Sequence, residues 1–449
     1  MGLNPKVNML GFILKRLAFT LLSIPIIIWI MLALTRLSPI DPVEQLIDAN
    51  DFATDQIAFA KIYEQTAIKN ELNKAPFYFT MNRSNYSKDF YSIANPLKKQ
   101  FFYTFLQANY GFQQIETYYN NIYEIAENSN QSILLNTSKK KATELIHQWE
   151  IELQGNQEIM KHIEVLKASK NNSKALLPKF IFHGSNNTFH STFKQFITLN
   201  WGKSLNDGKS ATKKILSALP ITLFILFISV IVSMVFGVLF GTWFHRSPSK
   251  LTEFIEQLFY ILKSIPLFVF ALFMLNSFTT SEISPLLKIF PSVNAYGWSS
   301  NSSLWSNLIR NFNQLILPIL CIVFLSIPYI ARLIKTTLNR ENAAVYNKTA
   351  MMKGLDEKQI FKHKLKNIRG ILVTLVSNKL IAGLTGSVII EYIFNIPGIG
   401  RLLLDSIREN DLTVLMPIVL IVFIFSTIVM LFSDILYQRF NPQIKLTDG

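Results

Sequence analysis

The sequence predicts an all-α membrane protein of six transmembrane helices, with a mostly helical insertion outside the membrane between the first and second helices. Two observations on composition lead to this fold class. Half of the 449 residues are hydrophobic, and 16% are charged, against about 25% in ordinary soluble domains. This composition excludes a disordered chain and a typical soluble enzyme. The third observation is a set of six long apolar runs.

Each apolar run is long enough to cross a bilayer core about 30 Å thick, which needs roughly 20 residues of helix. A helix buried in a soluble protein is rarely apolar all round over this length. The first run is also longer than the core of a cleavable signal peptide, so we expect it to be a retained anchor. The runs are Leu17–Leu37, Leu219–Thr242, Phe254–Phe278, Leu315–Ile334, Ile368–Ile390 and Val414–Leu436.

The distribution of basic residues predicts the orientation of the spans, because cytoplasmic loops carry an excess of Lys and Arg. With the N-terminus inside, the inner segments hold 16 Lys and Arg residues and the two short outer loops hold four. We therefore expect both termini in the cytoplasm. Much of the net charge of +15 then reflects topology, and a nucleic-acid partner is not expected.

The segment of about 38–214 is expected outside the membrane and includes an insertion of about 84–185. Apolar residues at helical spacing in Lys140–Lys170 predict helices, with a polar linker near Lys170–Lys174. Cys321 is the single cysteine, so the segment must be ordered by its own core or by a partner rather than by a disulfide. The apolar residues are Leu145, Trp149, Leu153, Ile159, Ile163 and Leu166.

Two lysines lie well inside apolar runs, Lys263 in the third and Lys379 in the fifth. A charge at the bilayer centre costs several kcal/mol, so such residues usually face protein or water. One interpretation is the polar wall of a pathway. The alternative is snorkelling or pairing, for example of Lys263 with Glu256 two turns earlier. The spans lack the set of carboxylates that an ion-coupled transporter would need.

Three small or constraining residues predict details of helix packing. Gly237 and Gly241 form a small-xxx-small pair in the second run, a spacing that allows two helices to approach closely. Pro266 predicts a kink in the third run, because proline lacks the N–H group that a helix interior needs.

Catalytic and metal-binding patterns are missing from the sequence. The six histidines lie outside the apolar runs and form no His-Glu-x-x-His arrangement. Gly202-Lys203-Ser204 resembles the end of a phosphate-binding loop, but Ile197 stands where that loop needs a glycine. We expect no catalytic residue, no metal and no bound cofactor, and no ATP hydrolysis by this chain alone.

The connection of residues 335–367 is long for a membrane loop and can form two short helices. Gly354 is suited to end the first helix, since glycine readily takes the left-handed conformation. Asp356 can cap the free amides of the second. Small residues beside lysines suit docking into a groove of a partner protein. The alternative is a solvated basic loop next to anionic lipid.

This connection resembles the ATPase-docking "EAA" loop of binding-protein-dependent ABC importer permeases. Its Tyr-x-x-Thr-Ala-x-x-Lys-Gly-Leu form, residues 346–355, is similar to the dipeptide and oligopeptide branch. Arg340 departs from the family by replacing an acid, with Glu341 one place later. Further motifs follow in the family order over about 10–80 and 188–446: Pro39-x-Asp41-Pro42, Gly202-x-Ser204, Ser264-Ile265-Pro266, Glu391-x-x-Phe394-x-x-Pro397-Gly398-x-Gly400 and Asn441-Pro442.

The resemblance implies the ABC type I importer permease fold and the first, or "B", permease of a heterodimeric pair in the cytoplasmic (inner) membrane of a bacterium. It implies a sister permease, two ATPase subunits that bind ATP and Mg, and an extracytoplasmic substrate-binding protein. Dipeptides or oligopeptides are the expected substrates, moved by alternating access. Nickel complexes or other small solutes are the alternative, and an ion-coupled secondary transporter is a more distant one.

The resemblance also implies a domain plan and site residues. The first span occupies 1–37, the extracytoplasmic segment 38–214, and the permease core 215–446 with its docking loop at 335–367. Lys379 and Glu391 are expected on the translocation pathway. The residues expected to contact the ATPase are Glu341, Ala343, Ala344, Tyr346, Thr349, Ala350, Lys353, Gly354 and Leu355.

Overall fold

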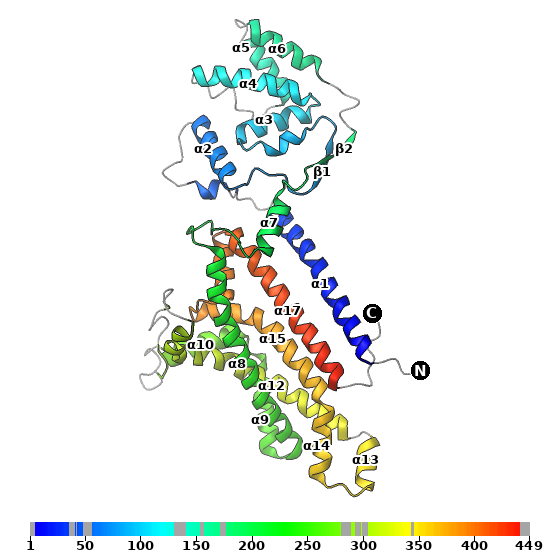
Figure 1. Ribbon diagram of the computed structural model, residues 1–449. Coiled ribbons are helices and arrows are strands. Elements are labelled where there is room, and N and C mark those ends of the chain that lie inside the picture. Colours follow the sequence, from blue (N-terminus) through cyan, green and yellow to red (C-terminus); the bar gives the residue numbers. More distant parts are fainter. Residues whose placement is uncertain are drawn as a thin grey trace. The chain divides into compact units, whose positions relative to one another are not determined.

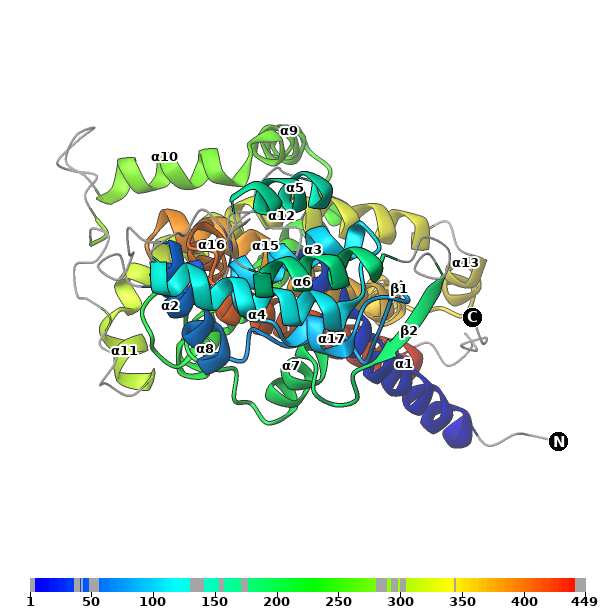
Figure 2. The same cartoon turned by 90° about the horizontal axis from the view of Figure 1, so that it is seen from above.

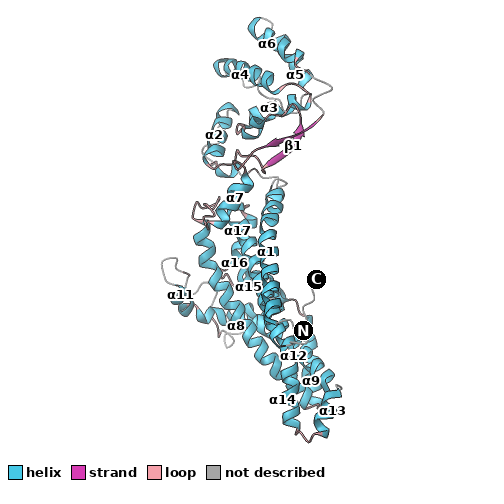
Figure 3. Cartoon of the chain, turned by 45° about the vertical axis from the view of Figure 1, so that its right-hand side comes forward, coloured by secondary structure: helices cyan, strands magenta, loops and turns pink. Residues whose placement is uncertain are grey.

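The computed structural model describes most of the chain, and the described part is mostly helical, with one two-stranded ribbon (Figure 3). The chain divides into two compact units. The membrane unit comprises residues 1–24, 202–204 and 209–449, and the insertion unit comprises 25–201 and 205–208. The described residues are 5–35, 41, 43–47, 56–129, 141–152, 157–170, 177–279, 289–291, 298, 304–342 and 345–440.

Five helices of the described chain are long and apolar enough to cross a membrane (Figure 1). They coincide with five of the six apolar runs and confirm the predicted all-α membrane fold. Each also extends beyond its run at one or both ends, because polar residues at the ends continue the helical hydrogen bonding. The helices are α1 (Pro5–Thr35), α8 (Ala211–Arg246), α12 (Phe312–Asn342), α15 (Arg369–Ile393) and α17 (Leu412–Phe440).

The third apolar run forms two helices rather than the one kinked helix that the sequence predicted. The helices α9 (Lys250–Ser264) and α10 (Leu267–Thr279) differ in direction by 100°. Figure 2 shows α9 end-on and α10 along its length. Ile265 between them is extended, with φ −79° and ψ 123°, since the residue before a proline avoids the helical region. Pro266 therefore breaks this helix completely.

A close helix contact of the membrane unit joins α8 to α12. A Cβ atom added at Gly237 would lie 2.5 Å from the side chain of Ile330, and one added at Gly241 would lie 2.6 Å from the backbone oxygen of Ala331. Such distances leave no room for any side chain. The two glycines therefore allow the close approach that their spacing predicted.

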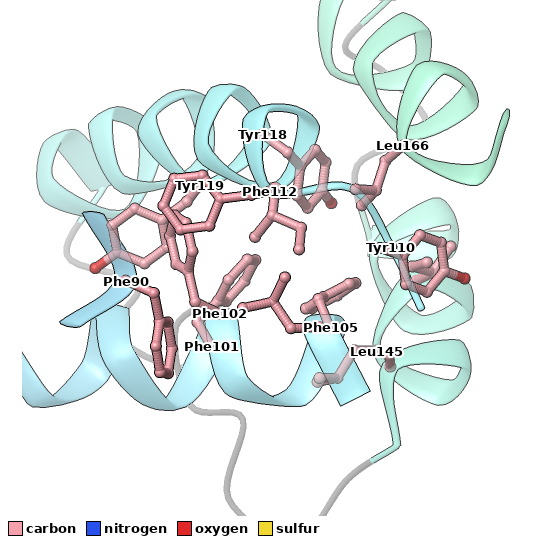
Figure 4. Packing of buried hydrophobic residues seen from close by; sticks show 14 of the residues in the cluster. Phe90, Phe101, Phe102, Phe105, Tyr110, Phe112, Tyr118, Tyr119, Leu145 and Leu166 are labelled. Atoms are coloured by element: carbon pink, nitrogen blue, oxygen red, sulfur yellow. The ribbon is translucent and has the colours of Figure 1, made fainter. Parts of the chain in front are cut away.

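The insertion unit has an aromatic core at the junction of four helices (Figure 4). Phe101 and Phe105 of α3 pack beside Tyr118 of α4, and Trp149 of α5 stacks on Phe101 with ring centroids 5.6 Å apart. None of the four side chains is more than 1% exposed. The helices of this unit are α2 (Gln56–Lys69), α3 (Pro96–Gln107), α4 (Phe112–Ser129), α5 (Ala142–Glu152), α6 (Gln157–Ala168) and α7 (Thr188–Ile197).

The helical spacing in Lys140–Lys170 agrees with this core. Leu145, Ile163 and Leu166 are each at most 2% exposed, so α5 and α6 bury the face that the pattern predicted. Leu153 lies outside the described residues, as does the expected linker from residue 171 onward.

Two short strands at the ends of the insertion were not predicted. The strands β1 (Phe79–Arg83) and β2 (Pro178–Phe182) pair antiparallel, with Phe79 opposite Phe182 and Arg83 opposite Pro178. His183 extends the pairing, since its backbone amide donates to the carbonyl of Tyr78 at 2.7 Å. The strands close the insertion where it leaves and rejoins the rest of the chain.

Candidate functional site

The connection of residues 335–367 has the helix–glycine–helix form that the sequence predicted. The helix α12 continues to Asn342, and α13 (Val345–Met352) and α14 (Glu357–Asn367) follow beside its end (Figure 1). Gly354 between them has φ +77°, the left-handed conformation that ends helices. Asp356 begins α14 with a capping box, in which its carboxylate accepts from the amide of Gln359 at 2.7 Å.

Polar contacts and one cation–π contact attach α14 to the spans. Asn367 Nδ2 donates to the carboxylate of Glu341 at 3.2 Å, and Lys364 Nζ donates to Asn342 Oδ1. These bonds connect the C-terminal half of α14 to the end of α12. The guanidinium of Arg246, the last residue of α8, lies 4.9 Å from the ring centre of Phe361.

Apolar packing completes this attachment. Phe361 and Leu365 of α14 pack against a buried cluster to which α12 contributes Ile334 and Leu338, and which includes Ile368 at the start of α15. The helix α14 is therefore connected to α8, α12 and α15 together. A force on α14 is transmitted to three spans, because packed interiors have low compressibility.

The helix α13 presents an exposed surface on the same loop. Asn347 is 2% exposed, and its Nδ2 donates to the backbone oxygen of Glu341. This bond attaches α13 to the end of α12. Met352 at the end of α13 is 87% exposed, and Thr349 and Lys353 are exposed as well. This surface is accessible to a partner protein.

The residues expected to contact the ATPase are distributed over this loop. Thr349, Lys353 and Gly354 are exposed, whereas Glu341, Ala350 and Leu355 are half-buried. Tyr346 belongs to α13. Ala343 and Ala344 lie outside the described residues.

Sequence reasoning missed the residues that hold the loop in place. Asn342, Asn347 and Asn367 are polar residues in a polar segment, and Lys364 is one of eight Lys and Arg residues between positions 335 and 367. Nothing in their spacing distinguishes them from solvated side chains. Only the folded chain shows that Asn347 and Lys364 are buried.

Both lysines in the spans lie against one tyrosine. Lys379 Nζ of α15 is 5.1 Å from the ring centre of Tyr329 and 3.4 Å from Ser326 Oγ. Lys263 Nζ at the end of α9 is 5.6 Å from the same ring centre. The suggested pairing of Lys263 with Glu256 is wrong, because Glu256 forms its ion pair with Lys335 of α12.

A cavity of about 220 Å³ lies next to Lys263, between α8, α9 and α12. Lys263, Arg332 and the Glu256–Lys335 pair line it together with aromatic side chains. The guanidinium of Arg332 lies 4.9 Å from the ring centre of Tyr260. The cavity therefore combines cationic and aromatic walls, which suit an anion or a carboxylate.

Glu391 holds the start of the short helix α16 (Ile399–Arg408). Its buried carboxylate accepts from Thr222 Oγ1 at 2.8 Å and from the amides of Gly400 and Arg401 at 2.7 and 3.1 Å. An anion is favourable at a helix N-terminus. A Cβ at Gly398 would lie 2.4 Å from this carboxylate, which explains the glycine there. The place of Glu391 on a pathway stays a prediction.

Comparisons with known proteins agree with the resemblance of the motifs. Residues 233–446 match the family described as "Binding-protein-dependent transport system inner membrane component". The dipeptide transport system permease protein DppB of Bacillus subtilis is 25% identical over 256 residues, covering 56% of this chain and 77% of that protein. The oligopeptide transport system permease protein AppB of the same organism is 28% identical over 240 residues, covering 53% and 73%.

A further relative is named for a different substrate. The nickel import system permease protein NikB of Staphylococcus aureus is 27% identical over 255 residues, covering 56% of this chain and 70% of that protein. All three relatives are permease components, so the chain is a multi-pass transport protein of the inner membrane rather than an enzyme. The family match over residues 233–446, the spanning helices and the ordered motifs agree, and they make this chain similar to the inner-membrane permease components of binding-protein-dependent importers.

Proposed function

We propose that this chain is one of two permease subunits of an importer that moves dipeptides or oligopeptides into the cell at the expense of ATP. A sister permease would complete the channel, and two ATPase subunits would bind ATP and Mg. A substrate-binding protein would deliver the peptide from outside. Permeases named for dipeptide and oligopeptide transport among its relatives support the choice of peptide.

The attachment of the docking loop to three spans is the observation that carries the mechanism. In the proposed cycle the ATPases close on ATP and displace α13 and α14. Because α14 is bonded to α12 and packed against α8 and α15, the displacement rotates these helices as a body. Such rigid-body motion opens the pathway alternately to each side. In this cycle α14 transmits the motion to the spans that form the pathway, and the ATPases supply the energy.

Gly354→Asp tests the docking role in the reconstituted importer. A side chain at φ +77° strains the turn and adds a charge beside α13. Peptide uptake should fall at least about tenfold, and ATP hydrolysis should no longer respond to loaded binding protein. Lys353→Glu tests the same surface without backbone strain. Unchanged coupling in both variants would contradict the docking role.

Gly208→Asp is the matched control for this experiment. Gly208 also has positive φ, +65°, and an added Cβ meets nothing within 4 Å. It belongs to the insertion unit, whereas the docking loop belongs to the membrane unit. Its aspartate should leave the coupling of ATP hydrolysis to uptake unchanged.

The orientation of the termini belongs to the proposal and is tested by labelling. Cys321 is buried, so a membrane-impermeant thiol reagent should leave the natural chain unlabelled. Thr349→Cys should react only when the inner face is accessible, and Met81→Cys should react in intact cells. Labelling of Thr349→Cys in intact cells would reverse the proposed topology.

A further inference from the structure

One face of the spanning helix α12 is polar along much of its length. Ser326, Tyr329, Arg332, Thr336 and Asn339 follow one another at intervals of three or four residues, which places them on one side of a helix. The last four are exposed, and the row extends about 20 Å at 1.5 Å per residue. Polar residues in a span face protein or water rather than lipid. We call this row the polar face of α12.

The other sides of α12 have a different role. Ile330, Ile334 and Leu338 are fully buried. Ile330 and Ala331 pack against Gly237 and Gly241 of α8. Asn339 at the end of the row lies 2.7 Å from His245 Nδ1 of α8, but the contact with α8 does not account for the rest of the polar face. Arg332 and Tyr329 lie beside the helix contact rather than within it.

Cations gather along the polar face. Lys379 and Lys263 both contact Tyr329, and Arg332 contacts Tyr260. Among the described residues, no ion pair joins any of these three cations to a carboxylate; the adjacent Glu256 is paired with Lys335. Aromatic rings stabilise a cation without accepting all its N–H groups. Donors on the lysines and the arginine thus remain available to a ligand.

The cavity beside the polar face has room for part of a small solute. Its volume of about 220 Å³ equals roughly seven water molecules at about 30 Å³ each. Lys263 and Arg332 are in its wall, together with Phe259 and Pro328. A guanidinium binds a carboxylate through two parallel hydrogen bonds, and the apolar wall accommodates the carbon atoms next to that carboxylate.

We propose that the polar face of α12 is a carboxylate-binding stretch of the translocation pathway, along which the terminal carboxylate of a peptide passes between Lys379, Lys263 and Arg332. This inference rests on the proposed import function and names its substrate class, a solute that carries a carboxylate. Several weak sites in series favour both uptake and release of a transported solute. The same cations repel a positively charged metal complex.

The test uses the complete importer in vesicles and two probes. The first is a casein hydrolysate of short peptides, and the second is the same hydrolysate with its carboxylates converted to methyl esters. Uptake is followed by mass spectrometry after the affinity of the binding protein for each probe has been measured. Lys379→Gln, Lys263→Gln and Arg332→Gln should each lower uptake of the free acids at least about tenfold, with a smaller change for the esters.

Two further variants separate a binding role from a structural one. Arg332→Lys keeps the charge and should recover part of the preference for free acids. Lys250→Gln removes an exposed lysine at the first position of α9 and should change uptake of neither probe. An equal loss of both probes in the three glutamine variants, or no loss, would overturn the carboxylate proposal.

Lipid composition supplies the remaining comparison. The uptake measurements are repeated in vesicles of phosphatidylcholine alone and with added phosphatidylglycerol. If the effect of Arg332→Gln appears only with the anionic lipid, the polar face binds a lipid headgroup and the proposal fails. If the natural chain with its partners imports neither probe, the import function itself fails, which is a different result from uptake without selectivity.

Discussion

The insertion unit is packed through large aromatic residues, whereas the membrane unit has small residues at a close helix contact. The insertion unit buries large rings such as Phe101, Tyr118 and Trp149. The membrane unit places Gly237 and Gly241 at a close contact between α8 and α12. Burial of apolar area drives folding in water, at about 25 cal/mol per Å². Between helices in lipid this gain is missing, so close backbone contact and internal hydrogen bonds replace it.

The spanning helix α8 has apolar residues on its surface and polar residues among its buried positions. Ile231 and Leu239 of α8 are 57% and 56% exposed, which is favourable for a lipid-facing helix. The buried positions of the same helix include the polar residues Thr222, Ser229 and Ser233. The size and polarity of buried side chains therefore depend on whether water or lipid surrounds the unit. The effect of a core substitution must be judged separately in each unit.

Gly241→Leu should have the largest effect, because it acts on the contact that organises the membrane unit. A Cβ here lies 2.6 Å from the backbone oxygen of Ala331, so α8 and α12 must separate. We expect a loss above about 4 kcal/mol and no uptake, measured by thermal unfolding in detergent and by transport. Gly11→Leu is the control, since nothing lies within 4 Å of a Cβ there. Normal unfolding of Gly241→Leu would show that the contact is not needed.

Trp149→Ala should have the next largest effect and should stay within the insertion unit. Trp149 is 1% exposed and stacks on Phe101 and Phe105, so its removal should cost about 3–5 kcal/mol. Hydrogen exchange of the full chain should become faster in α3 and α4 and stay unchanged in α8 and α12. Ile151→Ala, 59% exposed on the same helix, is the control. Faster exchange in both units would contradict their independence.

The smallest expected effect is a pH dependence of the stability of the insertion unit that comes from His183. This side chain is 4% exposed beside β1. Burial, with a contribution from Lys88, lowers the pKa of this imidazole below its ordinary value of 6.5. The unfolded chain therefore binds the proton more readily than the folded one, and the insertion unit loses stability as pH falls below that value.

The pH dependence of unfolding checks this effect over about pH 5 to 8. Unfolding of the insertion unit is followed by tryptophan fluorescence in the full chain. His183→Gln should flatten the acid side of the profile, and His147→Gln, at an exposed position of α5, should not. An unchanged profile in His183→Gln would assign the acid sensitivity to other groups.

Features set by neighbouring residues could be predicted from the sequence. The end of α13 at Gly354 and the start of α14 at Asp356 depend on glycine conformation and on a carboxylate next to free amides. The long apolar runs likewise report spans directly. The contact of α8 with α12 was visible in the spacing of Gly237 and Gly241, although the sequence did not identify the partner helix.

Features that join distant residues could not be predicted. Glu256 pairs with Lys335, 79 positions along the chain, rather than with the nearer Lys263. The partners of the Glu391 carboxylate come from α8 and α16. The strands β1 and β2 are short and lie at opposite ends of the insertion. Neither strand has a pairing partner nearby in the sequence, so no hairpin pattern predicts them. Only the folded chain decides among such pairings.

The antiparallel ribbon of β1 and β2 holds the two ends of the insertion close together. Directly opposed residues of an antiparallel pair have Cα atoms about 4.5–5.5 Å apart, and Arg83 stands opposite Pro178. A tight turn could join them and omit residues 84–177 altogether. An insertion between Arg83 and Pro178 therefore leaves the two flanking ends of the chain close together, whatever its length.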